Sequence, residues 1–138
     1  FSEISLGDDH QNPTRLTCFE WQGSRHWWQG NVRSAQLENG YWAVNVVQAG
    51  NYQITLRRWP AELNASITAA IAGGKAIKAV QAKLRIGTIE AIQPIATGAR
   101  AVTFPVRLEE GKTRLQTWFI DEAGESRGAF YLEAKRLD

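Results

Sequence analysis

The sequence predicts an all-β fold, an antiparallel β-sandwich with a jelly-roll arrangement of about eight strands. Two observations support this prediction. Short segments in which apolar and polar residues alternate recur along the chain, which is typical of strands that bury one face. Turn-forming residues such as Gly50-Asn51 and Gly111-Lys112 separate these segments at short, regular spacing, which is typical of sandwich domains.

The expected strands end at turns or where the alternation changes. They cover residues 3–6, 14–21, 41–48, 52–59, 76–86, 99–109, 113–121 and 128–137. The turn at residues 49–51 predicts that the third and fourth strands form an antiparallel hairpin. Pro105 lacks a backbone donor, so the sixth strand is expected at a sheet edge or at a bulge. Residues 61–71 are open between a short helix, which their alanines favour, and an irregular crossover loop.

Alternation also assigns side chains to the two faces of a strand. Val80 is expected to share the apolar face of Leu84, because an even number of residues separates them. The charge of Lys83 is expected to point outward, on a solvated face. In the seventh strand, Trp118 is expected on the face opposite Phe119.

Composition limits the kind of protein. The chain of 138 residues, with 43% apolar and 22% charged residues, is long enough for one domain with a real core, residues 1–138. The net charge of +2 is small and the cations are scattered, which argues against a nucleic-acid partner. No apolar run reaches membrane-spanning length. The chain begins Phe-Ser-Glu-Ile and contains no Met, so we expect it to be a piece of a longer polypeptide.

No catalytic set assembles from the sequence. Ser24 near His26 is the one local suggestion of a nucleophile and its base, and both fall in an expected loop. The carboxylates of Glu109-Glu110 fall at a turn, where solvated charges are expected. With one cysteine, Cys18, and two distant histidines, no metal site is expected; Asp8-Asp9 alone offers too few calcium ligands.

Two stretches are candidates for contact with a ligand or another domain. The first is a long expected loop with aromatic rings for stacking and arginines for carboxylate or sulfate groups. Its candidate residues are Arg25, His26, Trp27, Trp28, Gln29 and Arg33. Three interpretations stay open: a loop that closes one end of the sandwich, a docking surface for another domain, or direct ligand contact.

The second stretch is the corner formed by Arg57, Arg58 and Trp59, just before Pro60. Alternation directs Arg57 outward, where it can contact a ligand. Arg58 breaks the alternation of apolar and polar residues along the strand. It is therefore expected to be buried or paired, against Glu62 or against Trp59. The whole stretch is either a packing corner or a contact surface for an anion, a sugar or another domain.

Taken together, ten stretches in order along the chain resemble the C-terminal region of bacterial arylsulfatase-type sulfatases. The most specific is Leu-Arg-Arg-Trp-Pro at residues 56–60. The stretches are 12–16, 21, 28–29, 40–44, 50–62, 74–77, 82–87, 101–104, 111–118 and 127–131. The resemblance covers nearly the whole chain, although no single motif in it is diagnostic.

The resemblance implies that this chain is a non-catalytic accessory domain. In that family, catalysis belongs to an N-terminal domain that carries a formylglycine and a calcium ion. Cys18 is followed by Phe-Glu-Trp and not by the x-Pro-Ser-Arg that formylglycine formation needs, so no catalytic residue is carried over. The resemblance implies a catalytic domain of the same chain as partner, a sulfated glycan as candidate ligand, no cofactor in this fragment, and a periplasmic or secreted parent.

Two other classes of function remain as alternatives. One is an independent carbohydrate-binding β-sandwich module that uses Trp27, Trp28 and Arg33. The other is an enzyme in its own right, which the missing acid–base set disfavours. Accordingly, the fragment is expected to have no activity alone, and its parent is expected to be a sulfatase.

Overall fold

The computed structural model describes residues 4–8, 13–17, 41–58, 67, 79–96, 98–122, 124, 126–129 and 131–137. Within these ranges the regular elements are strands, and no helix occurs. The strands are β1 (Ile4–Leu6), β2 (Thr14–Thr17), β3 (Tyr41–Val46), β4 (Gly50–Arg57), β5 (Ala79–Ile86), β6 (Ile89–Pro94), β7 (Val102–Leu108), β8 (Gly111–Asp121), β9 (Ser126–Arg127) and β10 (Tyr131–Arg136).

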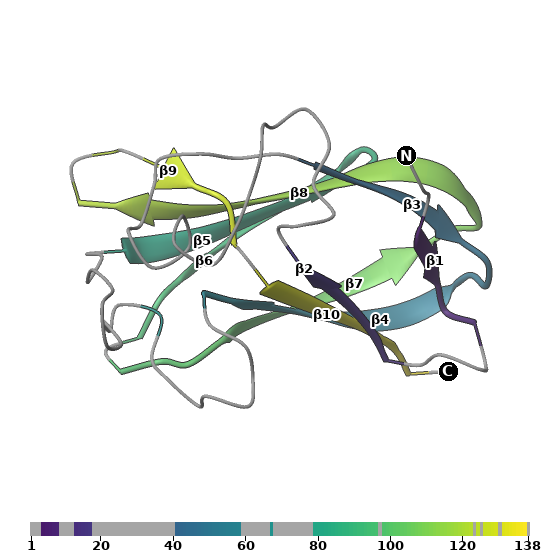
Figure 1. Cartoon of the computed structure of the whole chain (residues 1–138), viewed down its shortest axis with the longest axis horizontal. Helices are drawn as coiled ribbons and strands as arrows, with labels where there is room; N and C mark the ends of the chain where they lie inside the picture. Colours follow the sequence, from purple (N-terminus) through teal and green to yellow (C-terminus); the bar gives the residue numbers. More distant parts are fainter. Residues whose placement is uncertain are drawn as a thin grey trace.

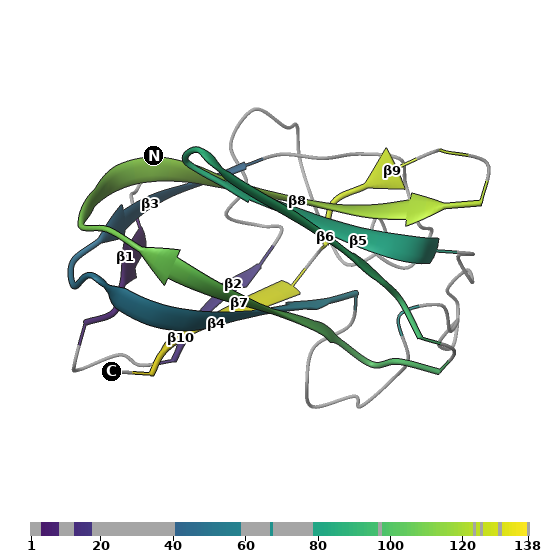
Figure 2. The same cartoon turned by 180° about the vertical axis from the view of Figure 1, so that it is seen from behind.

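The strands form two sheets that pack face to face as a sandwich (Figures 1 and 2). The six-stranded sheet has the order β1-β3-β8-β5-β6, with β9 paired to β8. The four-stranded sheet has the order β2-β10-β4-β7. The predicted all-β sandwich is therefore confirmed.

The connectivity is that of a jelly roll. When the short strands β1 and β9 are set aside, the other eight are numbered 1 to 8 in chain order. The four-stranded sheet then reads 1-8-3-6, and the matching part of the other sheet reads 2-7-4-5. All neighbours in these two series are antiparallel, whereas β1 joins β3 in parallel. Two interleaved four-strand series are what a double-sheet jelly roll requires.

The predicted hairpin between the third and fourth strands is wrong. β3 belongs to the six-stranded sheet and β4 to the four-stranded sheet, so residues 47–49 cross from one layer to the other. Alternation places one face of each strand in the core, but it does not distinguish a neighbour in the same sheet from a strand across the core. A true hairpin joins β5 and β6, where Gly87 takes a positive φ of 60°.

The core lies between the sheets and is formed by side chains of alternate residues from both. Its largest apolar members, Trp42, Tyr52, Phe104 and Phe119, are fully or almost fully buried. Burial of such a side chain contributes roughly 1.5–3 kcal/mol. The Trp42 Nε1 donates to the Thr17 carbonyl at 2.9 Å, so this side chain also ties the two sheets together.

Two expectations about strand positions have opposite outcomes. Pro105 lies on β7, at the edge of the four-stranded sheet, and is exposed, as predicted. Val80 does not share the buried face of Leu84, since it is 36% exposed. The register shifts between Ala79 and Gln81, and this irregularity moves Val80 to the outside while Ala79 turns inward.

Both open sides of the sandwich are joined by hydrogen bonds. On one side, the Gln93 Nε2 of β6 donates to the Thr103 carbonyl of β7 at 3.0 Å. On the other, the Thr14 hydroxyl of β2 donates to the Ser5 carbonyl of β1 at 3.4 Å. These contacts reduce the exposure of unpaired strand edges, which promote aggregation when they are open. The described residues include no helix long and apolar enough to cross a membrane.

Candidate ligand-binding face

Most of the loop candidates predicted from the sequence lie outside the described residues. These are Arg25, His26, Trp27, Trp28, Gln29, Arg33 and Trp59. Cys18, Ser24 and Glu62 also lie outside them. The described candidates are Arg57 and Arg58.

The alternation argument for Arg57 and Arg58 is confirmed. Arg57 is half-buried and lies on the outer side of β4, paired in register with Tyr131 of β10. Arg58 follows directly and is fully buried. Burial and, to a smaller extent, the nearby charge of Arg127 together lower the pKa of Arg58 to about 10. The two neighbours are thus separated into an outward and an inward cation.

A second group of side chains gathers on the outer side of the six-stranded sheet. We call it the aromatic–cationic face. It consists of Tyr41, Lys83, Arg85, Glu90, Arg114, Gln116 and Trp118. These residues come from four adjacent strands, β3, β8, β5 and β6. Each is half-buried or exposed, while the residues that alternate with them point into the core.

Strand register brings these side chains into rows. Gln116 of β8 lies opposite Tyr41 of β3 on one side and Arg85 of β5 on the other. Trp118, two residues further along β8, lies opposite Lys83. Directly opposed residues on one face of a sheet have Cβ atoms about 4.5–5.5 Å apart, so their side chains contact one another.

At least one cationic side chain lies over each of the two aromatic rings of this face. The Lys83 Nζ lies 4.9 Å from the Trp118 ring centroid, and the Arg85 guanidinium carbon lies 5.6 Å from it. The Arg114 guanidinium carbon lies 4.5 Å from the Tyr41 ring centroid. Such contacts hold long side chains over the rings without removing their charge from solvent.

Glu90 is the acidic member of the face. Its carboxylate pairs with the Lys83 Nζ at 3.1 Å and with the Arg85 Nη2 at 3.0 Å. Hydrogen bonds from these two side chains hold the pKa of Glu90 below its ordinary value. With three cations and one carboxylate, the face keeps a formal excess of positive charge.

A shallow hollow of about 380 Å³ opens at one end of this face. It is lined by Arg85 and Gly87 from the β5 side and by Thr113, Arg114 and Gln116 from β8. Two guanidinium groups therefore stand at its rim. Arginine binds carboxylate and sulfate groups through paired hydrogen bonds, so the hollow suits an anionic group of a larger ligand.

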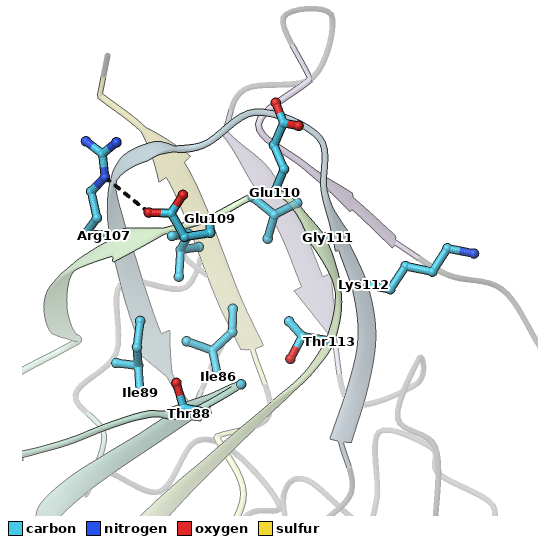
Figure 3. A pocket seen from close by; sticks show the side chains of 12 residues that line it. Ile86, Thr88, Ile89, Arg107, Glu109, Glu110, Gly111, Lys112 and Thr113 are labelled. Carbon is cyan, nitrogen blue, oxygen red and sulfur yellow. Dashed lines mark ion pairs between the residues drawn. The ribbon is translucent and has the colours of Figure 1, made fainter.

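A smaller cavity of about 190 Å³ lies where the β5–β6 turn approaches the β7–β8 turn (Figure 3). Its floor includes Ile86 and Ile89. Glu109 points toward Arg107, with 3.9 Å between carboxylate and Nε, whereas Glu110 points away. Both glutamates are exposed, as the sequence predicted for turn charges, and they do not converge on a cleft as a glycosidase pair would.

The aromatic–cationic face was not predicted as a site. The sequence did predict that Lys83 points outward and that Trp118 lies on the face opposite Phe119. Their convergence depends on the strand order β3-β8-β5-β6, which pairs residues far apart in the chain. A search of the sequence for outward-facing aromatic residues flanked by outward-facing cations would have found single members of the face. It would not have shown which of these members are neighbours in space.

Comparisons with known proteins give a fold and no family. No protein-family model matches the chain, and no curated protein matches its sequence. Among solved structures, the chain is similar to a ruminal GH26 endo-β-1,4-mannanase, with a TM-score of 0.55 and 11% identity. The match covers 91% of this chain and 26% of that one, so the chain spans about a quarter of the enzyme's length. At this identity, the likeness shows a shared sandwich fold.

Proposed function

We propose that this chain is a non-catalytic accessory domain of a larger carbohydrate-active hydrolase, and that its aromatic–cationic face contacts the saccharide. The observation that carries the proposal is the position of Trp118. Its ring lies on the outer side of the central strand of a broad sheet, with Lys83 and Arg85 over it and Tyr41 one strand away.

The chemistry of this face matches a sugar polymer. A ring on an open strand offers a flat apolar surface, and sugar rings have apolar faces that pack on aromatic side chains. Gln116 and the rim arginines, Arg85 and Arg114, offer donors to hydroxyl, carboxylate or sulfate groups. An open sheet face also admits an extended chain, which an enclosed pocket excludes.

The ordered sequence resemblance makes a sulfatase the proposed parent. Under this proposal, a catalytic domain of the same chain is the partner, a sulfated glycan is the ligand, and the parent is secreted or periplasmic. The excess of cations around Trp118 supports a sulfated ligand. One solved structure similar to this chain is named as a mannanase, which supports the broader class of carbohydrate-active enzymes.

Formylglycine and calcium belong to the proposed parent and are not assigned to this chain. Within the described ranges, no three His, Cys, Asp or Glu side chains form a group that could hold a metal ion. Cys18 lacks the following residues that formylglycine formation needs. Under this proposal, catalysis belongs to another domain of the parent.

Affinity electrophoresis and calorimetry with a sulfated polysaccharide and its desulfated form test the proposal. We expect Trp118→Ala to weaken binding roughly tenfold, the upper range for one aromatic contact. Tyr131→Ala is the matched control, because Tyr131 is a half-buried aromatic on the outer side of the other sheet. Absence of binding to any polysaccharide by the folded chain, or equal binding by Trp118→Ala, would refute the proposal.

A further inference from the structure

Two arginines from opposite sheets point into the sandwich at the same end. Leu56 of β4 is fully buried, Arg57 points outward, and Arg58 therefore points inward again. Arg127 of β9 lies opposite Phe119 of β8, whose side chain is in the core, so Arg127 shares that inner side. In both views, β9 and the carboxyl end of β4 lie toward the same end of the molecule (Figures 1 and 2).

Both residues are buried beyond nine-tenths. Arg58 is 0% exposed and Arg127 is 7% exposed. They are close enough for the charge of Arg127 to act on Arg58. Because arginine stays protonated at neutral pH, this end of the interior carries two positive charges. Like charges in a desolvated site repel each other, and an anion bound beside them would reduce this repulsion.

Two of the three donor nitrogens of Arg127 are not used within the part of the chain that the structure describes. Its Nε and Nη1 are both buried, and neither makes a hydrogen bond. Buried donors in folded proteins almost always have a partner, so two unused donors on one buried guanidinium point to a group that binds there.

A buried hydrogen bond lies two residues from Arg127 along the chain. Thr117 is fully buried, and its hydroxyl oxygen accepts a hydrogen bond from the Ala129 amide at 3.0 Å, two residues after Arg127. Gly128 and Ala129 are buried with it. The segment that carries Arg127 is therefore fixed against β8 inside the sandwich.

We propose that the unused donors of Arg127, beside the buried Arg58, bind a free oxyanion of the carboxylate or sulfate type at this end of the sandwich. Oxyanions present several acceptors and negative charge, which match two buried guanidinium groups. The site is internal and distinct from the aromatic–cationic face, so it does not rest on the proposed glycan-binding function. Bound oxyanion would stabilise the folded chain, because the unfolded chain has no such arrangement.

Sulfate titration of the chain, against chloride at equal ionic strength, tests the site. We expect a saturable rise in Tm of roughly 5–10 °C at a sulfate concentration about a hundred times the dissociation constant. We also expect the Nε–H NMR signal of Arg127 to shift with the same dissociation constant. Acetate should compete with sulfate, since both present paired oxygens.

Matched variants separate this site from general salt effects. Arg127→Leu should lose the saturable part of the Tm rise, and Arg107→Leu, which removes an exposed arginine, should keep it. If Arg127→Leu does not fold, Arg127→Lys, which keeps the charge but loses the forked donors, should bind sulfate at least tenfold more weakly.

A carboxylate of this chain is the competing source of the oxyanion. Glu62 is the carboxylate that the sequence predicted beside Arg58. If the wild-type chain shows no saturable response to sulfate, or if a response appears only in Glu62→Gln, the proposal of a free oxyanion is overturned. An equal response in Arg127→Leu and wild type would overturn it as well.

Discussion

Trp42 and Trp118 lie on neighbouring strands of the six-stranded sheet, and their side chains point to opposite sides of it. Trp42 is fully buried and its indole nitrogen bonds to the other sheet. Trp118 is half-buried and lies beneath two cations on the outer side. The same residue type thus stabilises the fold on one side and offers a contact surface on the other.

Arg85 and Arg127 show the same contrast between the outer and inner sides of the six-stranded sheet. Arg85 on the outer side has Glu90 and the Trp118 ring as neighbours, and half of its side chain is in solvent. Arg127 on the inner side is buried next to a second cation, Arg58. Exposed cations contribute little to stability and can exchange partners with a ligand, whereas buried cations need a fixed or bound anion.

The largest expected difference between the two sides is in stability. Trp42→Ala should lower the free energy of unfolding by about 3–5 kcal/mol, because it removes a large core side chain and leaves a cavity. Trp118→Ala should lower it by about 1 kcal/mol or less, since that ring is partly in solvent. Urea denaturation followed by circular dichroism measures both. Equal destabilisation would show that Trp118 is also a core residue.

Trp42→Phe sharpens the first prediction. This variant keeps most of the ring volume but leaves the Thr17 carbonyl without its donor. We expect an intermediate loss of about 1–3 kcal/mol, the cost of an unsatisfied buried acceptor. A loss as large as that of Trp42→Ala would assign the whole effect to the hydrogen bond.

Because Arg58 and Arg127 are buried close together, we expect the free energy of unfolding to rise at alkaline pH. Burial and the Arg127 charge lower the folded pKa of Arg58 to about 10, well below its ordinary value. As pH rises above 10, the unfolded chain therefore binds more protons at this residue than the folded chain does, and stability increases. Arg127→Leu removes part of the cause, so its alkaline gain should be smaller.

The titration of Tyr52 changes the free energy of unfolding in the opposite direction at alkaline pH. Its effect therefore has to be removed before the contribution of the two arginines is measured. Burial raises the pKa of Tyr52, an effect that the charge of Arg136 partly offsets. Its contribution is present below its ordinary pKa of 10 and is lost as pH rises above that value. Denaturation between pH 8 and 11 should therefore compare Tyr52→Phe with the double variant that adds Arg127→Leu. Identical pH profiles would contradict the repulsion between the two arginines.

Alternation in the sequence was enough to find the sandwich and to separate Arg57 from Arg58, because inward and outward directions follow directly from a period of two. The same alternation gave the wrong partner for β3, since strands that face each other across a core and strands that pair side by side bury residues alike. Val80 was misplaced because a register shift is not visible in a short apolar run.

The aromatic–cationic face was harder to predict from the sequence than the fold. Tyr41, Arg85 and Trp118 are far apart in the chain and meet through long-range strand order. No local motif marks them. The nearby pairing of Arg85 with Glu90, by contrast, crosses a single hairpin, and local sequence could have suggested it.

The smallest expected effect concerns Glu90 on the outer side. Its depressed pKa means that its contribution to stability is present above the ordinary value of 4.5 and is lost as pH falls through the lower folded value. Because the group is exposed, Glu90→Gln should change neutral-pH stability only slightly while removing this acid-dependent part. It should also free Lys83 and Arg85 for a ligand. We therefore expect affinity for a sulfated polysaccharide to rise roughly two- to fivefold, the size of one surface ion pair.

Glu133→Gln is the matched control for Glu90→Gln, because Glu133 pairs with Arg15 at 3.5 Å on the outer side of the other sheet. It removes the same charge and should leave sulfated-glycan affinity within the error of calorimetry, apart from a small change in net charge that salt screens. If both variants raise affinity equally at 0.15 M salt, the gain reflects the total charge of the chain. A gain confined to Glu90→Gln instead locates the anionic ligand beside Lys83 and Arg85, on the side of the sheet opposite Trp42.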